Sequence, residues 1–314
     1  MWTMFNSIAL SYLAREFTIF RASKNHILGL LSSNALTMFF LPNQTTSTNI
    51  VDNSVLTYGA ELHYLEAGEG SMLILLHGLG SNAWSWSNVI SSLAEDFYAI
   101  ALDQIGLGDS EKPFLSYRIN TLVDFLHGFY QVLGIDKASL IGHDIGGWTA
   151  AALALKYPNS VENLVLVATD PFSTATRRCK AFLPPATCQQ TLEHLQQLFY
   201  ERDRFVNQQI AEQIFTQKNT INDGYTTHQL VQSIARNEDV LDNLLEKLAI
   251  PTLIVQGNED KLVPLSVSHR LHQEIRNSRL QILNRCGHLP HIEQPEAFTE
   301  IVRSFLGCRG SPKL

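Results

Sequence analysis

The feature that most constrains the fold of this 314-residue chain is a glycine-rich turn at residues 142–147, Gly-His-Asp-Ile-Gly-Gly. An apolar run at residues 138–141 enters the turn, and an alanine-rich segment of helical character, residues 148–155, leaves it. Glycines on both sides of Asp144 relieve crowding around a strained backbone. The pattern is typical of a nucleophile elbow, a sharp turn between a strand and a helix. Its apex here is an aspartate, where a serine is the usual residue.

Alternating apolar and amphipathic segments predict the fold class around this turn. Residues 54–58 and 61–65 predict a hairpin, and residues 72–76 predict a strand that is buried on both faces. Further strands are expected at 98–102, 161–168, 251–255 and 279–283, and helices at 88–93, 119–133, 266–275 and 295–305. This order predicts an α/β fold with a mostly parallel, doubly wound sheet. Catalytic groups in such sheets collect at the carboxyl ends of the strands.

A segment without strand pattern interrupts this alternation between residues 170 and 248. It is helical in character, with candidate helices at 191–200, 204–215 and 225–234. A helical insertion between two strands predicts a cap over the strand ends. We therefore expect an α/β core at residues 50–169 and 249–307, a helical cap at 170–248 and a tail at 308–314.

The first 49 residues differ in composition from the rest of the chain. A basic stretch precedes an apolar run at residues 27–41, which polar residues interrupt. The run is shorter than the ~20 residues that a membrane-spanning helix needs, so no stable membrane span is predicted. Three interpretations stay open: a targeting segment, a disordered extension outside the fold, or residues upstream of a true start at Met38.

Composition limits the partners and the compartment. The net charge of −7 gives no electrostatic basis for binding nucleic acid. The four cysteines show neither CxxC nor metal-ligand spacing, which favours a reducing compartment and indicates no metal site. We expect a cytoplasmic protein that acts on a small molecule, with targeting by residues 1–49 as the alternative. A homodimer is a possible assembly.

Three titratable residues follow predicted strands in the order nucleophile, acid, base. Asp144 occupies the elbow, Asp260 follows the strand at 251–255, and His288 follows the last strand. An aspartate orients and stabilises a histidine that acts as a general base. The backbone N–H groups of Leu79, in a His-Gly-Leu-Gly segment, and of Ile145 are the expected oxyanion hole.

Together these motifs resemble the α/β-hydrolase superfamily over about residues 50–307. The elbow and the segment Asp-Gln-Ile-Gly-Leu-Gly-Asp-Ser-Glu-Lys-Pro at residues 103–113 resemble the branch of epoxide hydrolases and haloalkane dehalogenases. That branch uses an aspartate nucleophile. The C-terminal third is more similar to serine-dependent carbon–carbon bond hydrolases of aromatic degradation.

The charge of Asp144 indicates which reaction to expect. A carboxylate is ionised at neutral pH and needs no base to attack. Attack on a carbonyl gives an anhydride that reverts, whereas attack on an sp³ carbon gives a stable ester between protein and substrate. His288, oriented by Asp260, then activates water against that ester. This chemistry implies no cofactor and no metal.

The resemblance does not identify the leaving group of the substrate. Dehalogenases of this branch usually carry Trp or Arg after the nucleophile, where this chain has Ile145. Epoxide hydrolases open the ring with two cap tyrosines, for which Tyr200 and Tyr225 are candidates, and we expect His77 to contact substrate as well. Gly80 stands where epoxide hydrolases usually have proline. We expect epoxide hydrolysis. The alternatives are dehalogenation, a divergent ester or carbon–carbon hydrolase, and a ligand-binding protein with little turnover.

Overall fold

The computed structural model describes residues 49–176 and 185–307 and contains one eight-stranded sheet. The strand order is β1-β2-β4-β3-β5-β6-β7-β8. The β1–β2 and β2–β4 pairs are antiparallel, and the other five neighbouring pairs are parallel. The predicted α/β fold with a mostly parallel sheet is therefore confirmed.

The strands agree with the apolar runs of the sequence. Their bounds are β1 Val51–Thr57, β2 Ala60–Ala67, β3 Ser71–Leu76, β4 Phe97–Leu102, β5 Ala138–His143, β6 Val161–Val167, β7 Thr252–Gly257 and β8 Ser278–Leu283. The α-helices are α3 Ser87–Leu93, α4 Ile119–Leu133, α5 Ile145–Lys156, α6 Cys188–Leu198, α7 Arg202–Phe205, α8 Gln208–Ile221, α9 Gly224–Ala235, α10 Leu265–Glu274, α11 Pro290–Glu293 and α12 Pro295–Leu306. Short 3₁₀ helices are η2 Ala83–Trp86, η3 Pro158–Ser160 and η5 Leu245–Lys247.

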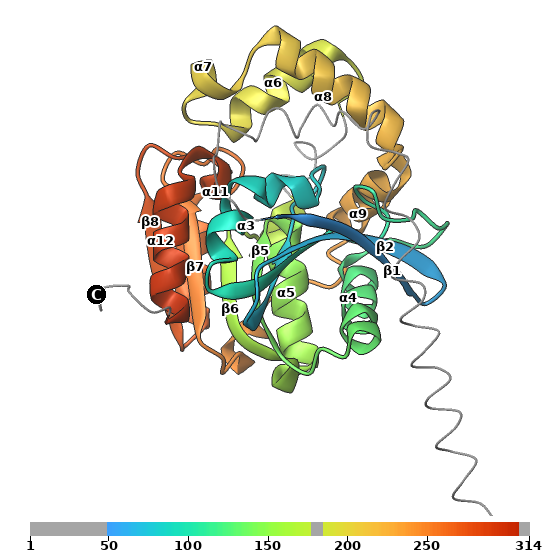
Figure 1. Cartoon of the computed structure of the whole chain (residues 1–314). Helices are drawn as coiled ribbons and strands as arrows, with labels where there is room; N and C mark the ends of the chain where they lie inside the picture. Colours follow the sequence, from blue (N-terminus) through green and yellow to red (C-terminus); the bar gives the residue numbers. More distant parts are fainter. Residues whose placement is uncertain (1–48, 177–184, 308–314) are drawn as a thin grey trace, which may run out of the picture. The chain divides into compact units, whose positions relative to one another are not determined.

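Helices cover both faces of the sheet (Figure 1). Residues of α4, α5 and α10 pack with Ile74 and Leu76 of β3 in one apolar cluster. Residues of α3 and α12 pack with Leu73 and Leu75 of the same strand in a second cluster. Because successive side chains of a strand point to opposite faces, a segment buried on both sides is apolar throughout, as residues 73–76 of β3 are.

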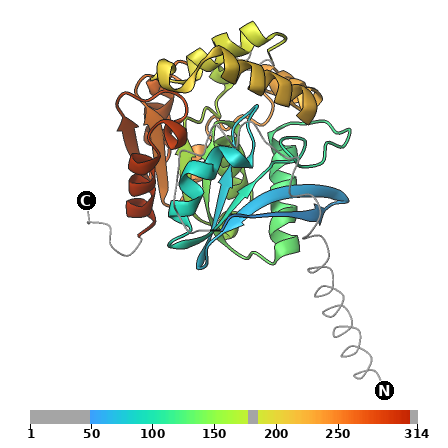
Figure 2. The same ribbon diagram turned by 45° about the horizontal axis from the view of Figure 1, so that its top comes forward.

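Helices α6 to α9 lie between β6 and β7 in the chain, and residues 170–176 and 185–248 contain no strand. The candidate helix at 204–215 is corrected, because α7 ends at Phe205 and α8 begins at Gln208. The Asn207 side chain accepts the N–H of Ile210 at 3.0 Å and starts α8 as a new helix. In Figures 1 and 2, α6 to α8 lie together beyond one end of the strands.

Contacts between the helical insertion and the rest of the fold include a small apolar cluster. It contains Leu195 and Phe199 from α6 and its end, and Leu289 and Ile292 around α11.

The predictions for residues 1–48 and 308–314 lie outside the described residues. In the described part of the chain, none of the helices combines the length and the apolar character needed to cross a membrane.

Candidate active site

Asp144 stands at the turn between β5 and α5. Its φ of 51° and ψ of −118° define a backbone conformation that residues other than glycine rarely adopt. The Asp144 N–H donates to the carbonyl of Val167 on β6 at 2.9 Å. A Cβ atom on Gly146 would lie 2.4 Å from the carbonyl oxygen of Leu76, so the start of α5 needs glycine there. Close packing against β3 and β6 thus maintains the strained turn.

Backbone N–H groups hold the Asp144 carboxylate. The N–H of Leu79 donates to its Oδ2 atom at 2.9 Å, and the N–H of Ile145 also hydrogen-bonds the carboxylate. These are the two N–H groups that the sequence assigns to an oxyanion hole. In the structure they bind the carboxylate of Asp144.

Asp260 and His288 form a hydrogen-bonded pair. The distance from His288 Nδ1 to Asp260 Oδ2 is 2.8 Å, and both side chains are buried. Asp260 Oδ1 accepts the N–H groups of Leu262 and Val263 at 2.8 and 3.0 Å, so the carboxylate has a fixed orientation. His143 Nε2 lies 3.0 Å from the carbonyl oxygen of His288. This contact connects the backbone of His288 to the elbow.

Burial and charge shift the pKa values of the nucleophile and base candidates. Burial raises the pKa of Asp144, against the opposing effects of His288 and the two backbone N–H groups. Burial alone would lower the pKa of His288, but the charges of Asp260 and Asp144 and the hydrogen bond to Asp260 raise it. The three predicted residues are therefore electrostatically coupled.

A cavity opens onto Asp144. Its lining consists of Leu79, Asp144, Ile145, Trp148, Asp170, Ala175 and Ile234. The Trp148 indole N–H donates to the carbonyl of Asp239 at 2.9 Å, so it is engaged away from Asp144. Asp170 was not predicted from the sequence. It stands three residues after the end of β6, and this position was the available signal, because strand ends meet at one edge of the sheet.

The predicted tyrosines do not lie in this cavity. The Tyr225 hydroxyl donates to the carbonyl of Leu115 at 3.1 Å, and its ring stacks on Phe114. Both Tyr200 and Tyr225 are 41% exposed, and neither lines the Asp144 cavity. The structure therefore does not bring these two hydroxyl groups to the elbow.

His77 lies in the support of the loop that carries Leu79. It is fully buried, its Nδ1 lies 2.8 Å from the Gly78 carbonyl oxygen, and its Nε2 accepts the N–H of Gln104 at 3.2 Å. Burial lowers its pKa. With both ring nitrogens engaged in the loop, His77 does not take the substrate-contacting position predicted from the sequence.

Two basic side chains of the helical insertion were missed in the sequence. The Lys218 ammonium pairs with Asp223 at 2.9 Å and would lie 3.9 Å from a Cβ atom on Gly80, next to Leu79. Burial lowers the pKa of His194 to about 4, and the charges of His288 and Lys218 act in the same direction. The positions of these side chains depend on how α6 and α8 pack, which the sequence pattern does not specify.

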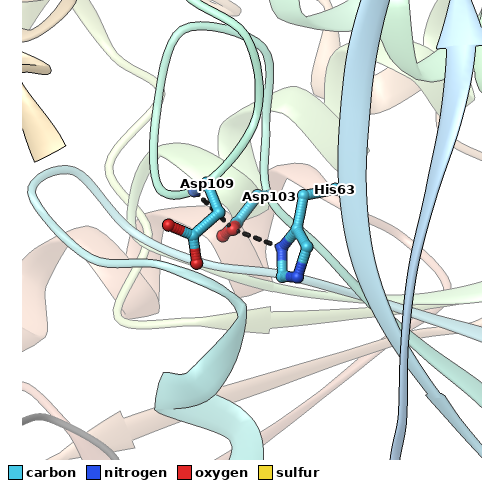
Figure 3. Close-up of side chains that lie close together, drawn as sticks. All are labelled: His63, Asp103 and Asp109. Carbon is cyan, nitrogen blue, oxygen red and sulfur yellow. Dashed lines mark hydrogen bonds and ion pairs between the residues drawn. The ribbon is translucent and has the colours of Figure 1, made fainter. Parts of the chain in front are cut away.

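His63, Asp103 and Asp109 form a second polar cluster (Figure 3). His63 Nδ1 lies 2.7 Å from Asp103 Oδ2, and His63 Nε2 lies 3.1 Å from Asp52 Oδ1. Burial would lower the pKa of His63, but Asp103 and Asp52 raise it to about 10. Both ring nitrogens of His63 face carboxylate oxygens, and His63 and Asp103 are buried, so this pair has the geometry of a buried ion pair.

Comparisons with known proteins agree with this fold. A family model described as alpha/beta hydrolase fold matches residues 72–295. The chain is 27% identical to 2-hydroxy-6-oxo-6-(2'-aminophenyl)hexa-2,4-dienoic acid hydrolase of Metapseudomonas resinovorans, over 85% of this chain and 94% of the relative. It is 28% identical to 2-hydroxy-6-oxo-2,4-heptadienoate hydrolase of Pseudomonas putida, over 82% and 97%.

A solved structure of a hydrolase is similar to this chain over most of its length. The meta-cleavage product hydrolase of Pseudomonas fluorescens superposes with a TM-score of 0.74 at 28% identity, over 81% of this chain and 97% of that chain. The resemblance to carbon–carbon bond hydrolases that the sequence shows in its C-terminal third thus extends over most of the chain. None of these similarities shows a relationship to epoxide hydrolases or dehalogenases.

Proposed function

Because the chain belongs to the alpha/beta hydrolase fold family, we propose that it is a hydrolase in which Asp144 attacks an sp³ carbon of a small apolar molecule. The contact between the Leu79 N–H and Asp144 Oδ2 carries this proposal. Carbonyl chemistry needs such N–H groups for the oxyanion of the substrate. Here an oxygen of Asp144 occupies them, which disfavours carbonyl substrates and favours displacement at carbon.

In the first step, Asp144 Oδ1 forms a bond to the substrate carbon, and the bond from that carbon to the leaving group breaks. The leaving group takes the bonding electron pair. Oδ2 stays on the N–H of Leu79, with the N–H of Ile145 also at the carboxylate, and becomes the carbonyl oxygen of the ester. The attack needs no proton transfer from Asp144, because the carboxylate is the reactive form.

In the second step, His288 accepts a proton from water, and the resulting hydroxide attacks the Asp144 carboxyl carbon. The charge that develops on Oδ2 is stabilised by the same two N–H groups. Collapse breaks the bond from that carbon to Oδ1, protonated His288 gives its proton to Oδ1, and the product leaves as an alcohol. Esterification also removes the Asp144 charge, one of the effects that raise the pKa of His288, and so favours the neutral imidazole when a base is needed.

An epoxide remains the first candidate substrate, and a haloalkane the second. The residues that line the cavity at Asp144 are largely apolar, which favours an apolar substrate and does not separate the two classes. Tyr200 and Tyr225 lie elsewhere, and Lys218 pairs with Asp223 and does not line this cavity either. We therefore assign stabilisation of the leaving oxygen or halide to none of these three side chains.

Trapping the ester tests the proposal. In His288→Gln, attack proceeds and hydrolysis stops, so incubation with a panel of epoxides and haloalkanes is expected to leave one adduct. Digestion and mass spectrometry should place that adduct on the peptide that contains Asp144. The Asp144→Asn/His288→Gln double variant is the matched control and should stay unlabelled. If wild-type protein consumes a compound that never labels His288→Gln, the proposed function is wrong.

The comparisons favour a second candidate, hydrolysis of a carbon–carbon bond in a 2-hydroxy-6-oxo-dienoate. That reaction requires the substrate carbonyl oxygen to displace Asp144 Oδ2 from Leu79. The compound named in the Pseudomonas putida relative, 2-hydroxy-6-oxo-2,4-heptadienoate, discriminates the two candidates. Turnover of this compound by the wild-type protein would favour the second candidate. Tight binding with neither adduct nor product would instead indicate a ligand-binding protein.

A further inference from the structure

Glu293 at the end of α11 connects two parts of the chain through its carboxylate. It is 5% exposed, and its Oε1 atom accepts the N–H of Gly287 at 2.7 Å. Its Oε2 atom accepts the N–H groups of Tyr200 and Glu201 at 2.7 and 3.4 Å. One buried side chain thus holds the residue before His288 and the segment that follows α6.

The same two segments meet through their backbones. The His288 N–H donates to the carbonyl of Leu198 at 2.7 Å. A Cβ atom on Gly287 would lie 2.4 Å from that carbonyl oxygen and 2.9 Å from Glu293 Oε1, so the approach depends on glycine. The loop that carries the candidate base is therefore attached to the end of α6 through two successive N–H groups. The Gly287 N–H is held through Glu293, and the His288 N–H bonds to Leu198 directly.

A carboxylate suits this position for a chemical reason. Its partners are all N–H donors, and an ionised carboxyl group offers only acceptors. Burial raises the pKa of Glu293, while the N–H groups of Tyr200 and Gly287 lower it. An amide of the same size would offer one oxygen and turn an NH₂ group toward a backbone N–H, which leaves a buried donor unpaired.

We propose that Glu293 is a positioning residue that sets His288 against the Asp144 ester by tying its loop to the helical insertion. This inference rests on the proposed function, because His288 acts only in the hydrolysis step. Its consequence is specific to that step. Loosening the loop slows hydrolysis of the ester and leaves the attack by Asp144 unchanged, so the ester accumulates.

Glu293→Gln tests this role in the full-length protein with a substrate that labels His288→Gln. Rapid-quench mass spectrometry measures formation and loss of the Asp144 ester separately. We expect hydrolysis to be about 10–100-fold slower, since small displacements of a catalytic group have effects of this size. Ester formation should stay within twofold of the wild-type rate. The apolar contacts of Leu289 and Ile292 with the insertion remain in this variant and support its folding.

Glu259→Gln is the matched control. Glu259 Oε2 accepts the N–H of Cys286 at 2.9 Å, in the same loop, and Glu259 Oε1 bonds to Asn258. The change in charge and shape is identical, but these two bonds do not reach the insertion. Ester hydrolysis in Glu259→Gln should stay within twofold of wild type. Equal slowing in both variants, or equal slowing of both steps in Glu293→Gln, would overturn the positioning role.

Amide hydrogen exchange gives a readout that needs no substrate. In Glu293→Gln, whichever of the Gly287 and Tyr200 N–H groups faces the amide NH₂ should exchange at least about tenfold faster, because it loses its acceptor. Unchanged exchange would overturn the inference even if the Asp144 ester forms. Faster exchange without any Asp144 ester would reject the proposed function and the role of His288 as base, while the tie between loop and insertion would stand.

Discussion

Replacing His63 by alanine is expected to destabilise the fold by about 3–5 kcal/mol, the usual cost of removing one partner of a buried ion pair. Asp103 is fully buried, and its carboxylate accepts the N–H groups of Ala83 and Asp109 at 2.6 and 2.8 Å. His63 supplies the positive charge at 2.7 Å. Without it, a buried carboxylate is left with no neutralising charge. Denaturant unfolding at neutral pH measures the loss.

The pH dependence of this stabilisation has a defined sign. Because folding raises the pKa of His63 from 6.5 to about 10, its contribution is complete below about pH 6.5 and is lost as the pH rises through 10. The difference in unfolding free energy between wild type and His63→Ala should therefore shrink between pH 7 and pH 10.

Asp52→Asn serves as the control for the other end of the network. The Asp52 side chain is 67% exposed, so its contact with His63 should contribute less than about 1 kcal/mol. A His63→Ala protein that loses no more stability than Asp52→Asn would show that His63 does not compensate the buried charge of Asp103.

Replacing Asp144 by asparagine should remove activity by a factor of at least about 10⁴, because the amide is not a nucleophile. The same variant should be more stable than wild type. Burial raises the pKa of Asp144, so the ionised carboxylate opposes folding, and above its unfolded pKa this cost grows as the pH rises. A gain of about 0.5–2 kcal/mol at neutral pH is expected, as for other residues that exchange stability for activity.

Asp260→Asn is the control that separates nucleophile from base. It should keep the first step and slow ester hydrolysis, because Asp260 acts only through His288. Steady-state rates and unfolding curves of both variants provide the check. An Asp144→Asn protein with more than about 1% of wild-type activity would mean that another group, or water itself, attacks the substrate.

The sequence predicted the sheet well because each strand has a strong local signal. The helix expected at residues 119–133 has those bounds in the structure, where Gly134 ends it in a left-handed conformation. The order of Asp144, Asp260 and His288 along the chain was also sufficient to predict that Asp260 and His288 would pair. Asp260 and His288 come close together in space because the parallel strands that precede them end at one edge of the sheet.

Side chains outside these strands were not predictable in the same way. Tyr200 and Tyr225 were chosen because they lie in the insertion, but their orientation depends on how each helix packs. Glu293 accepts N–H groups from residues more than ninety positions away, so no local pattern marks it. Its position is visible only once α11 and the end of α6 are brought together.

A single turnover in ¹⁸O-labelled water, with wild-type protein in excess over a substrate found in the panel, tests the role of Asp144 most directly. The ester mechanism predicts that the product alcohol carries unlabelled oxygen from Asp144 Oδ1, and that the Asp144 peptide gains one ¹⁸O atom. Product labelled in the first turnover, with an unlabelled Asp144 peptide, would show that water attacks the substrate directly and would contradict the account.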